Sequence, residues 1–572
     1  MKIKHLFGLA VIAAMTASCS SNEDLGTAGS GTGTNETGVG YATFTINLPS
    51  VSGTRTADAG GAEMDEGTAN EYAVKSATAL IFQKYGSDEG SCKFVESVDL
   101  PTAAADWTDD ATDGITTTKK LVAKLTNVDT KNQYYVLVLL NNNKTGGVKV
   151  ALPTVGQSYN EWNSQILTPS VDDLAADNDF YMANAPLKGT ASPTTLVTIN
   201  KENIYSSKEK AEAGTSAATV YVERGVAKMS VTDPTTKTVI DKATNNPTKS
   251  TVEFNNWALD ITNKRTYAVH NIDGLSTDFP DIWTTPRFIG TNSRVYWGKD
   301  PNYNLGNLNT GKEAEREAEF NFIKATNGIN KTFTESAYCL ENTFNLANMY
   351  QGQTTRVIFK ATYTPKDDAG NPLADKDGTF YTIGNMTNIL NEAALKTAVN
   401  TAATSVLPGC TVDYTNLKTK GSHVITLADI KDSNGTTLVA DKDYSGKTGT
   451  QIVKEINDKL GLIDGAGHAE AMVGINTYAQ GVTYYIARVK HFGSLTPWNS
   501  GESYGDNNLK YLGRYGMLRN NWYELTVGNV YGPGYPGVPP VDPNQPDDEN
   551  EKYLSVSVKI LSWAKRSDIV DL

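Results

Sequence analysis

A stretch of alternating apolar and polar residues lies near each end of the chain. The apolar positions of the first stretch are Ala42, Phe44, Ile46 and Leu48. Those of the second are Leu554, Val556, Val558 and Ile560, and Trp563 follows out of register, which suggests a bulge or twist. A two-residue period is typical of a strand with one buried and one solvent-facing side. The sequence therefore predicts one strand at each end, each with four apolar residues at the same pitch.

Segments without apolar periodicity flank these two strands. Residues 25–40 contain mainly Gly, Thr, Ser and Asn, which is typical of a flexible tether. The polar stretch behind the first strand is expected to be open to proteases, and it contains Arg55, the first arginine of the chain. Arg55 therefore marks a candidate cleavage site, before Thr56, although it could equally serve only to keep the loop soluble. Residues 532–551 are rich in Pro and acidic residues and predict an extended linker.

The body of the chain consists of short apolar runs with few helical patterns. Residues 134–140 (YYVLVLL) form a continuous apolar run, as in a central sandwich strand. Further strand-like runs lie at 77–82, 219–231, 356–363, 483–489 and 522–527. Helices are expected only near 391–402 and 451–460. The pattern predicts an all-β fold with few short helices, built from antiparallel sandwiches. A stretch rich in Asp, Pro, Thr and Asn at 233–249 predicts the boundary between two domains.

Composition and the first residues indicate an exported protein. The chain has 572 residues and a net charge of −13, which argues against nucleic-acid binding because phosphates require clustered Lys and Arg. A basic start and an apolar stretch at residues 6–17, too short to span a bilayer, lead to Cys19. Small residues directly before a cysteine are typical of a lipoprotein signal. We therefore expect acylation of Cys19 and anchoring in outer-membrane lipid.

Residue patterns that carry chemistry are missing from the sequence. The histidines are scattered, and no HExxH, GxSxG or Walker A motif occurs. Asp375 and Asp377 could belong to a calcium loop, but the set of ligands is incomplete and an acidic hairpin tip fits them better. Cys92, Cys339 and Cys410 show no CxxC spacing and are expected to be buried free thiols, although one disulfide is possible. We predict no catalytic residue, cofactor or metal, and no enzyme.

Several runs resemble the Bacteroidia fimbrillin family, most closely the shaft subunit of short, or minor, fimbriae. The runs that carry the resemblance are VYVERGVAKMSV at 220–231, YCLENT at 338–343, TTRVIFKA at 354–361 and RNNWYELTV at 519–527. They are followed by the Pro-rich segment and the terminal SVxVxxxxW tract. The resemblance implies two transthyretin-like β-sandwich domains in tandem, export as a lipoprotein and cleavage after Arg55. It also implies that the first strand is removed and that the last strand is donated to another copy. From the residues alone, both strands could instead complete the sheets of their own chain.

These inferences together predict a structural subunit of a cell-surface fimbrium that polymerises by donor-strand exchange and supports adhesion and biofilm formation. Its partners would be copies of itself, other fimbrial subunits and a surface receptor that the sequence does not identify. The alternatives are a fimbrial tip or anchor component, or a glycan-binding surface lipoprotein, which should display clustered exposed Trp and Tyr. The predicted division of the chain is a signal peptide (1–18), a tether (19–40), the first strand with the propeptide end (41–55), an N-terminal sandwich (56–235), a C-terminal sandwich (236–531), a linker (532–552) and a donor strand (553–572).

Overall fold

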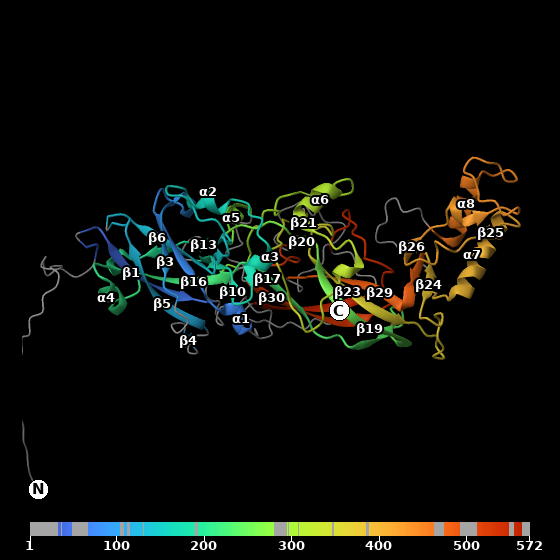
Figure 1. The fold of residues 1–572 in the computed structure, drawn as a ribbon, viewed down its shortest axis with the longest axis horizontal. Coiled ribbons are helices and arrows are strands. Elements are labelled where there is room, and N and C mark those ends of the chain that lie inside the picture. Colours follow the sequence, from blue (N-terminus) through green and yellow to red (C-terminus); the bar gives the residue numbers. More distant parts are fainter. Residues whose placement is uncertain are drawn as a thin grey trace, which may run out of the picture.

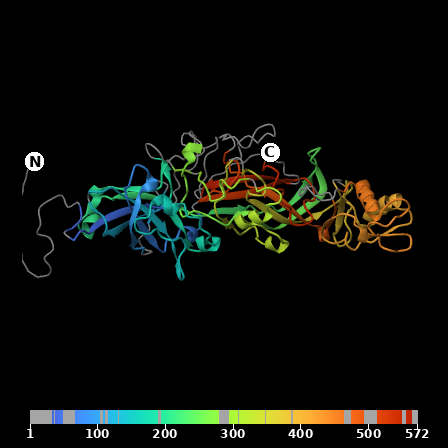
Figure 2. The ribbon, with the colours of Figure 1, turned by 90° about the horizontal axis from the view of Figure 1, so that it is seen from above.

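Extended strands dominate the computed structural model, and their order along the chain follows the apolar runs of the sequence. The structure describes residues 33–35, 37–48, 67–102, 108–110, 115–129, 131–188, 193–278, 294–295, 297–306, 308–345, 348–384, 388–462, 474–491, 512–547 and 554–562. The molecule is elongated, with an N-terminal sandwich at one end, a second large sheet in the middle and a smaller lobe with helices at the other end (Figure 1). The same three parts lie in a row in the perpendicular view (Figure 2). The expected mainly β fold with few helices is confirmed.

The N-terminal sandwich has two layers that share one long strand. One layer contains β15 (Ile204–Tyr205), β1 (Gly40–Asn47), β5 (Ile115–Leu125) and β4 (Thr108–Asp110). The other contains β3 (Lys93–Leu100), β2 (Ala77–Gln83), β6 (Tyr134–Leu140), β14 (Val197–Ile199) and β11 (Met182–Asn184). Strand β16 (Ala218–Arg224) pairs first with β1 and then with β11, and so joins the layers. The core between them includes the apolar residues of β2 and β6, as the continuous run YYVLVLL predicts.

The middle of the molecule is formed by a second large sheet. Its strands are β22 (Ala337–Cys339), β17 (Ala227–Val231), β30 (Asn521–Val530), β18 (Thr236–Ile240), β19 (Pro247–Asp260), β23 (Arg356–Thr364) and β29 (Val482–Arg488), with β31 (Leu554–Ser562) paired to β30. Its core gathers the buried residues of β23, β29 and β30. Most strands lie antiparallel, but β30 runs parallel to both β17 and β18.

The far end of the molecule is a small lobe with its own core. It contains β24 (Phe380–Ile383), β28 (Ile475–Tyr478) and β26 (Gly421–His423), and the pair β25 (Thr411–Val412) and β27 (Ile430–Lys431). Helices α7 (Glu392–Val406) and α8 (Gly449–Leu460) confirm both predicted helices. Thr448 and Gln451 form a capping box at the start of α8, and Gly461 ends it in the left-handed conformation with φ of 67°. This lobe was not expected as a separate unit.

Short elements complete the described part of the chain. The remaining helices are α1 (Ala69–Tyr72), α2 (Tyr159–Asn163), α3 (Val171–Leu174), α4 (Lys208–Ala213), α5 (Leu275–Asp278) and α6 (Glu313–Glu319). The remaining strand pairs are β7 (Asn143–Lys144) with β8 (Gly147–Val148), β9 (Ala175–Ala176) with β10 (Asp179–Phe180), β12 (Leu187–Lys188) with β13 (Pro193–Thr194), and β20 (Thr262–Asn263) with β21 (Phe320–Asn321).

The apolar run at 219–231 forms two strands in different sheets, where the sequence suggested one continuous strand. β16 belongs to the N-terminal sandwich and β17 to the middle sheet. Between them lies Gly225, where an added Cβ would stand 2.8 Å from Cδ1 of Tyr181. Only a residue without a side chain fits so close to this ring, and the chain turns there. It therefore changes sheets within the VERGVAK sequence, before the polar stretch at 233–249 that predicted the boundary.

Candidate functional site: two terminal strands and the domain junction

Strand β1 occupies the interior of its layer and has hydrogen-bonded neighbours on both edges. On one edge all eight of its residues pair antiparallel with β5, from Gly40 opposite Leu125 to Asn47 opposite Thr118. On the other edge, residues 44–47 pair parallel with β16, and residues 41–42 pair antiparallel with β15. Removing β1 would therefore leave a slot between β5 and β16 with unpaired backbone groups on both sides.

Both faces of β1 are covered. Phe44 and Ile46 are 0% exposed and Leu48 is 1% exposed, so the three predicted apolar residues lie in the core. On the opposite face, the Thr43 hydroxyl donates a hydrogen bond of 2.6 Å to the carbonyl oxygen of Ala211 in α4. The Thr45 hydroxyl lies 2.7 Å from the Ser216 hydroxyl. An antiparallel sheet commonly leaves one face to water, but this strand is covered on both.

Strand β31, the predicted donor strand, has one hydrogen-bonded neighbour among the described strands. It pairs antiparallel with β30 of its own chain. The register places Ile560 opposite Tyr523, Val558 opposite Leu525 and Val556 opposite Val527. These three residues of β30 are buried in the middle core. The tail therefore lies at the edge of its own middle sheet, whereas the resemblance to fimbrillins implied a strand donated to another copy.

The Pro-rich segment before β31 is docked on the body of the protein. Tyr535 and Tyr484 exchange backbone hydrogen bonds of 2.7 and 2.9 Å. Arg356, which is 2% exposed, donates to the carbonyl oxygens of Pro539 and Pro540 at 2.7 and 3.1 Å. Further along, the Asp547 N–H donates to the Met349 carbonyl at 3.1 Å. The segment contains bends and a turn where its prolines predicted an extended linker, and its hydrogen bonds fix it as far as Asp547.

The other predicted processing residues lie outside the described residues. They are Cys19, Arg55, Thr56 and Trp563. Cys92, Cys339 and Cys410 are free and buried, as expected. Asp375 and Asp377 accept hydrogen bonds from nearby backbone N–H groups, of Glu392 and Thr379 respectively.

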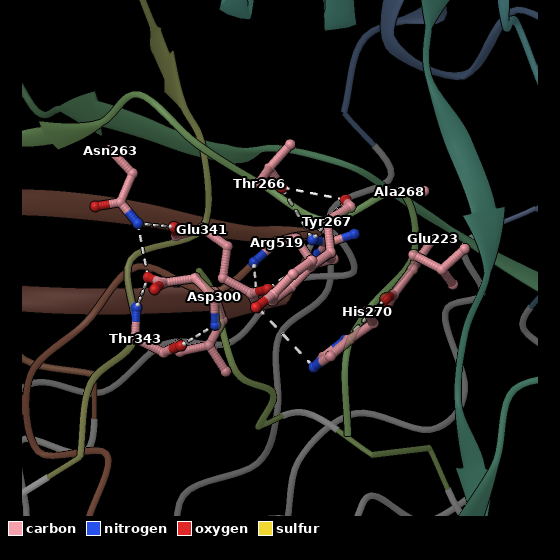
Figure 3. Close-up of polar contacts among 12 residues, drawn as sticks. Glu223, Asn263, Thr266, Tyr267, Ala268, His270, Asp300, Glu341, Thr343 and Arg519 are labelled. Atoms are coloured by element: carbon pink, nitrogen blue, oxygen red, sulfur yellow. Dashed lines mark hydrogen bonds and ion pairs between the residues drawn. The ribbon is translucent and has the colours of Figure 1, made fainter. Parts of the chain in front are cut away.

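Three of the four motifs that carry the family resemblance meet at the junction between the N-terminal sandwich and the middle sheet (Figure 3). Glu223 comes from the VYVERGVAK run, Glu341 from YCLENT and Arg519 from RNNWYELTV. Glu341 accepts a hydrogen bond from Arg519 Nε at 3.1 Å, and both side chains are nearly inaccessible to solvent. On the other side of the junction, Glu223 contacts His270 Nδ1 at 2.9 Å and pairs with Arg294.

A second buried contact lies at the same junction. The Glu71 carboxylate of the N-terminal sandwich pairs with Lys228 Nζ of β17 at 2.7 Å and accepts a hydrogen bond from the Tyr338 hydroxyl at 2.6 Å. Lys228 Nζ also lies 3.7 Å from the centroid of the Trp522 ring, a cation–π contact. Because breaking a buried ion pair leaves an uncompensated charge, these contacts hold the two parts in one arrangement.

Two carboxyl groups of the junction have pKa values shifted in opposite directions. Burial tends to raise the pKa of Glu223, but the charges of His270 and Arg294 outweigh it and lower that pKa to about 2. Asp300 lies close to Glu341 and has no cationic partner in its hydrogen bonds. Burial raises the pKa of Asp300 to about 8, against the effect of hydrogen bonds from Thr343, Asn302 and Asn263. The junction therefore combines a stable carboxylate with a carboxyl group that keeps its proton at neutral pH.

These motifs stand out in the sequence, but their role at the junction is not visible there. The signal in the sequence was the presence of charged residues within a strand-like run, such as Glu223, Arg224 and Lys228. Charged residues are seldom fully buried without a partner, so these residues indicate buried ion pairs. Their partners lie more than 40 residues away along the chain, so spacing could not pair them.

No arrangement in the described part of the chain suggests a metal centre or a membrane-spanning helix. No group of three or more His, Cys, Asp or Glu residues is placed to hold a metal ion among the residues described. No helix among them is long and apolar enough to cross a membrane. An open cleft of about 810 Å³ lies beside the junction, and the ion pair of Arg265 with Glu319 forms part of its wall.

Comparison with known proteins links the end of the chain to fimbriae. Residues 476–568 match the family model described as "Major fimbrial subunit protein type IV, Fimbrillin, C-terminal". This segment includes β29, β30, the docked Pro-rich segment and β31. No curated protein matches the chain. A crystal structure of a fimbrial assembly protein from Parabacteroides distasonis matches with 12% identity over 61% of this chain and 93% of that chain, and its TM-score of 0.25 is too low to support an argument about the fold. The carboxyl-terminal part of this chain is therefore similar to the fimbrillin C-terminal domain, and the family that it resembles consists of structural fimbrial subunits and not of enzymes.

Proposed function

We propose that this protein is a shaft subunit of a cell-surface fimbrium, close to the subunits of short fimbriae, and serves adhesion and biofilm formation. It is exported as a lipoprotein acylated at Cys19 and released when a protease cleaves after Arg55. The tail of one copy, residues 553–572, then enters the slot that β1 leaves in the next copy. Outer-membrane lipid, other copies of the chain and other fimbrial subunits are its partners.

The observation that carries this proposal is the contrast between the two terminal strands. β1 is paired on both edges, its apolar face is buried, and Thr43 on its other face is buried beneath α4, so its departure opens a slot that another strand can fill. Burial of Phe44, Ile46 and Leu48 contributes about 5–9 kcal/mol at about 1.5–3 kcal/mol per side chain. β31 has one hydrogen-bonded neighbour and the same four-residue apolar pitch. It can therefore give up its backbone hydrogen bonds to one strand, β30, and form hydrogen bonds to two strands in the slot.

The burial of arginines supports a selective cut near the first strand. Arg224, Arg356, Arg488, Arg514 and Arg519 are each at most 4% exposed. A protease specific for arginine requires an exposed, extended segment and would leave these sites intact. Limited digestion is therefore expected to spare these five sites.

Exchange between a tail and a slot on different surfaces produces filaments. Each copy offers one tail and one slot, so the contact is heterologous and can repeat without closing. The docked Pro-rich segment, fixed as far as Asp547, would hold the base of each tail on its own body. Only the residues beyond Asp547 would need to extend toward the neighbouring copy.

The test is to digest the purified chain, residues 20–572, with an arginine-specific protease and to follow the product on unboiled SDS gels. A ladder of oligomers is expected after cleavage and not before it. Arg55→Ala should prevent cleavage and ladder, whereas Thr56→Ala, which keeps the arginine, should permit both. Deletion of residues 553–572 should permit cleavage but abolish the ladder. A ladder that survives this deletion would refute the role of the tail.

A further inference from the structure

We propose that the tail of a second copy fills the slot in one register and one direction, with Leu554 at the position of Ala42 and the tail running as β1 does. This inference rests on the proposed strand exchange and adds the residues that decide it. Val556, Val558 and Ile560 then take the positions of Phe44, Ile46 and Leu48. The occupant is a strand of this same chain, so its sequence can be compared with the slot position by position.

The apolar face and the entrance of the slot exclude the neighbouring registers. A shift by one residue would turn every apolar side chain of the tail away from the core. A shift by two in one direction places Leu554 at Gly40, where even a Cβ would stand 2.6 Å from Cγ2 of Ile204. A shift by two in the other direction places Lys552 at Ala42, which is 0% exposed. A lysine there would bury an unpaired charge.

The covered outer face of the slot selects small hydroxyl residues. At Thr43, which is 2% exposed, the hydroxyl donates to the Ala211 carbonyl of α4 at 2.6 Å. The proposed register brings Ser555 to this position, and its hydroxyl can make the same bond. Ser557 comes to the position of Thr45, beside the Ser216 hydroxyl. The tail thus reproduces the polar pattern of β1 as well as its apolar pattern.

The same outer face decides the direction. If the tail ran the opposite way with its four apolar residues in the slot, Lys559 would lie at Thr43, in the middle of the strand beneath α4. In the proposed direction Lys559 lies at Asn47, which is 2% exposed, as Thr43 is, but is the last residue of β1, so that a long side chain can extend past the end of the strand. The proposed direction also keeps the eight-residue antiparallel pairing with β5. Ser555 and Lys559 are therefore the residues that determine orientation.

Engineered disulfides can test the register and direction in assembled protein. Val122 of β5 lies opposite Thr43, and Thr118 lies opposite Asn47. Opposite Cα atoms in an antiparallel pair are about 4.5–5.5 Å apart, within the reach of a disulfide. The chain carrying Ser555→Cys with Val122→Cys should, after cleavage and oxidation, give a covalent ladder on boiled non-reducing gels. Ser555→Cys with Thr118→Cys is the matched control and should give at least tenfold less. Free thiols are blocked before denaturation, because Cys92, Cys339 and Cys410 are present in both.

The outcomes separate this inference from the proposed function. Cross-linking through Thr118→Cys in place of Val122→Cys, or an unboiled ladder with neither cross-link, would overturn the register and leave strand exchange intact. The absence of any unboiled ladder from the single variant Ser555→Cys would overturn both.

A second pair of variants changes only the tail and leaves the slot residues untouched. Ser555→Lys should reduce the ladder at least tenfold, because it places a lysine beneath α4. Lys559→Ser should leave the ladder unchanged. Assembly of Ser555→Lys at the level of the unaltered chain would overturn the inference.

Discussion

The slot around β1 and the junction between the two large sheets are both buried, but different interactions hold them. The slot is lined by aliphatic and aromatic side chains and by backbone groups that pair with any strand of suitable alternation. The junction is closed by charged side chains: Glu71 pairs with Lys228 across it, and His270 lies between Glu223 and Glu341, which pairs with Arg519. An apolar slot tolerates replacement of its occupant, because hydrophobic burial is non-directional. A buried ion pair does not tolerate replacement of one partner, because the remaining buried charge would then be uncompensated and would destabilise the fold.

This contrast fits the two tasks that the proposed function requires. A fimbrial shaft must accept a foreign strand at one place and transmit force without bending at another. The exchangeable site uses burial and backbone hydrogen bonds, and the fixed site uses buried charge. The predictions below test whether the two sites behave independently.

The largest effect is expected from removing β1. A chain without residues 40–48 loses the burial of Phe44, Ile46 and Leu48, about 5–9 kcal/mol. This loss approaches the whole stability of a typical domain, so the N-terminal sandwich should unfold while the middle sheet persists. Hydrogen exchange of peptides from β6 and β23 should show lost protection in β6 only.

Two controls accompany this prediction. Deletion of residues 553–572 removes a strand with one hydrogen-bonded neighbour and should leave β6 protected. A synthetic peptide of residues 553–572 should restore protection of β6 in the chain without β1. Full protection of β6 in that chain without any peptide would show that no slot forms.

The junction should respond strongly to the loss of one charge. Arg519→Met leaves Glu341, which is 0% exposed, without its cationic partner and should lower the free energy of unfolding by about 3–5 kcal/mol. Urea unfolding followed by circular dichroism measures the change, and the two large sheets should then unfold in separate transitions. Adding Glu341→Gln should recover part of the loss. Lys208→Ala, which breaks an exposed pair with Glu212, is the control and should change stability by less than about 0.5 kcal/mol.

Sequence alone predicted the elements whose periodicity is local. β1, β6, β23, β29 and β30 lie where their apolar runs indicated, and α7 and α8 lie where the two helical patterns were found. Local periodicity works here because burial of one face depends on neighbours two to four residues away.

Features that depend on distant contacts were not predictable in this way. The split of 219–231 depends on the Tyr181 ring packed against Gly225. The docking of the Pro-rich segment depends on Arg356, which is far away in the sequence and reads there as an ordinary charged residue in a strand. The junction pairs Glu223 with His270 and Arg294 across three separate segments. In each case the deciding partner is fixed by the fold and not by sequence spacing.

The sharpest test of independence is the pH dependence of the junction. Burial raises the pKa of Asp300 to about 8 in the folded protein, from an ordinary value of 3.8. The folded state therefore holds a proton that the unfolded chain releases above about pH 4. The contribution of Asp300 to stability is full below that pH, falls as pH rises and is lost above about pH 8. Asp300→Asn cannot lose a proton, so its urea midpoint should vary less between pH 5 and pH 9 than that of the unaltered chain.

Glu223, with a pKa of about 2, does not titrate in this range. β1 contains no Asp, Glu or His, so the dissociation of assembled ladders should not follow the same curve. If Asp300→Asn changed the pH dependence of ladder dissociation as much as that of unfolding, the slot and the junction would be one coupled unit, and the division of tasks between them would fail.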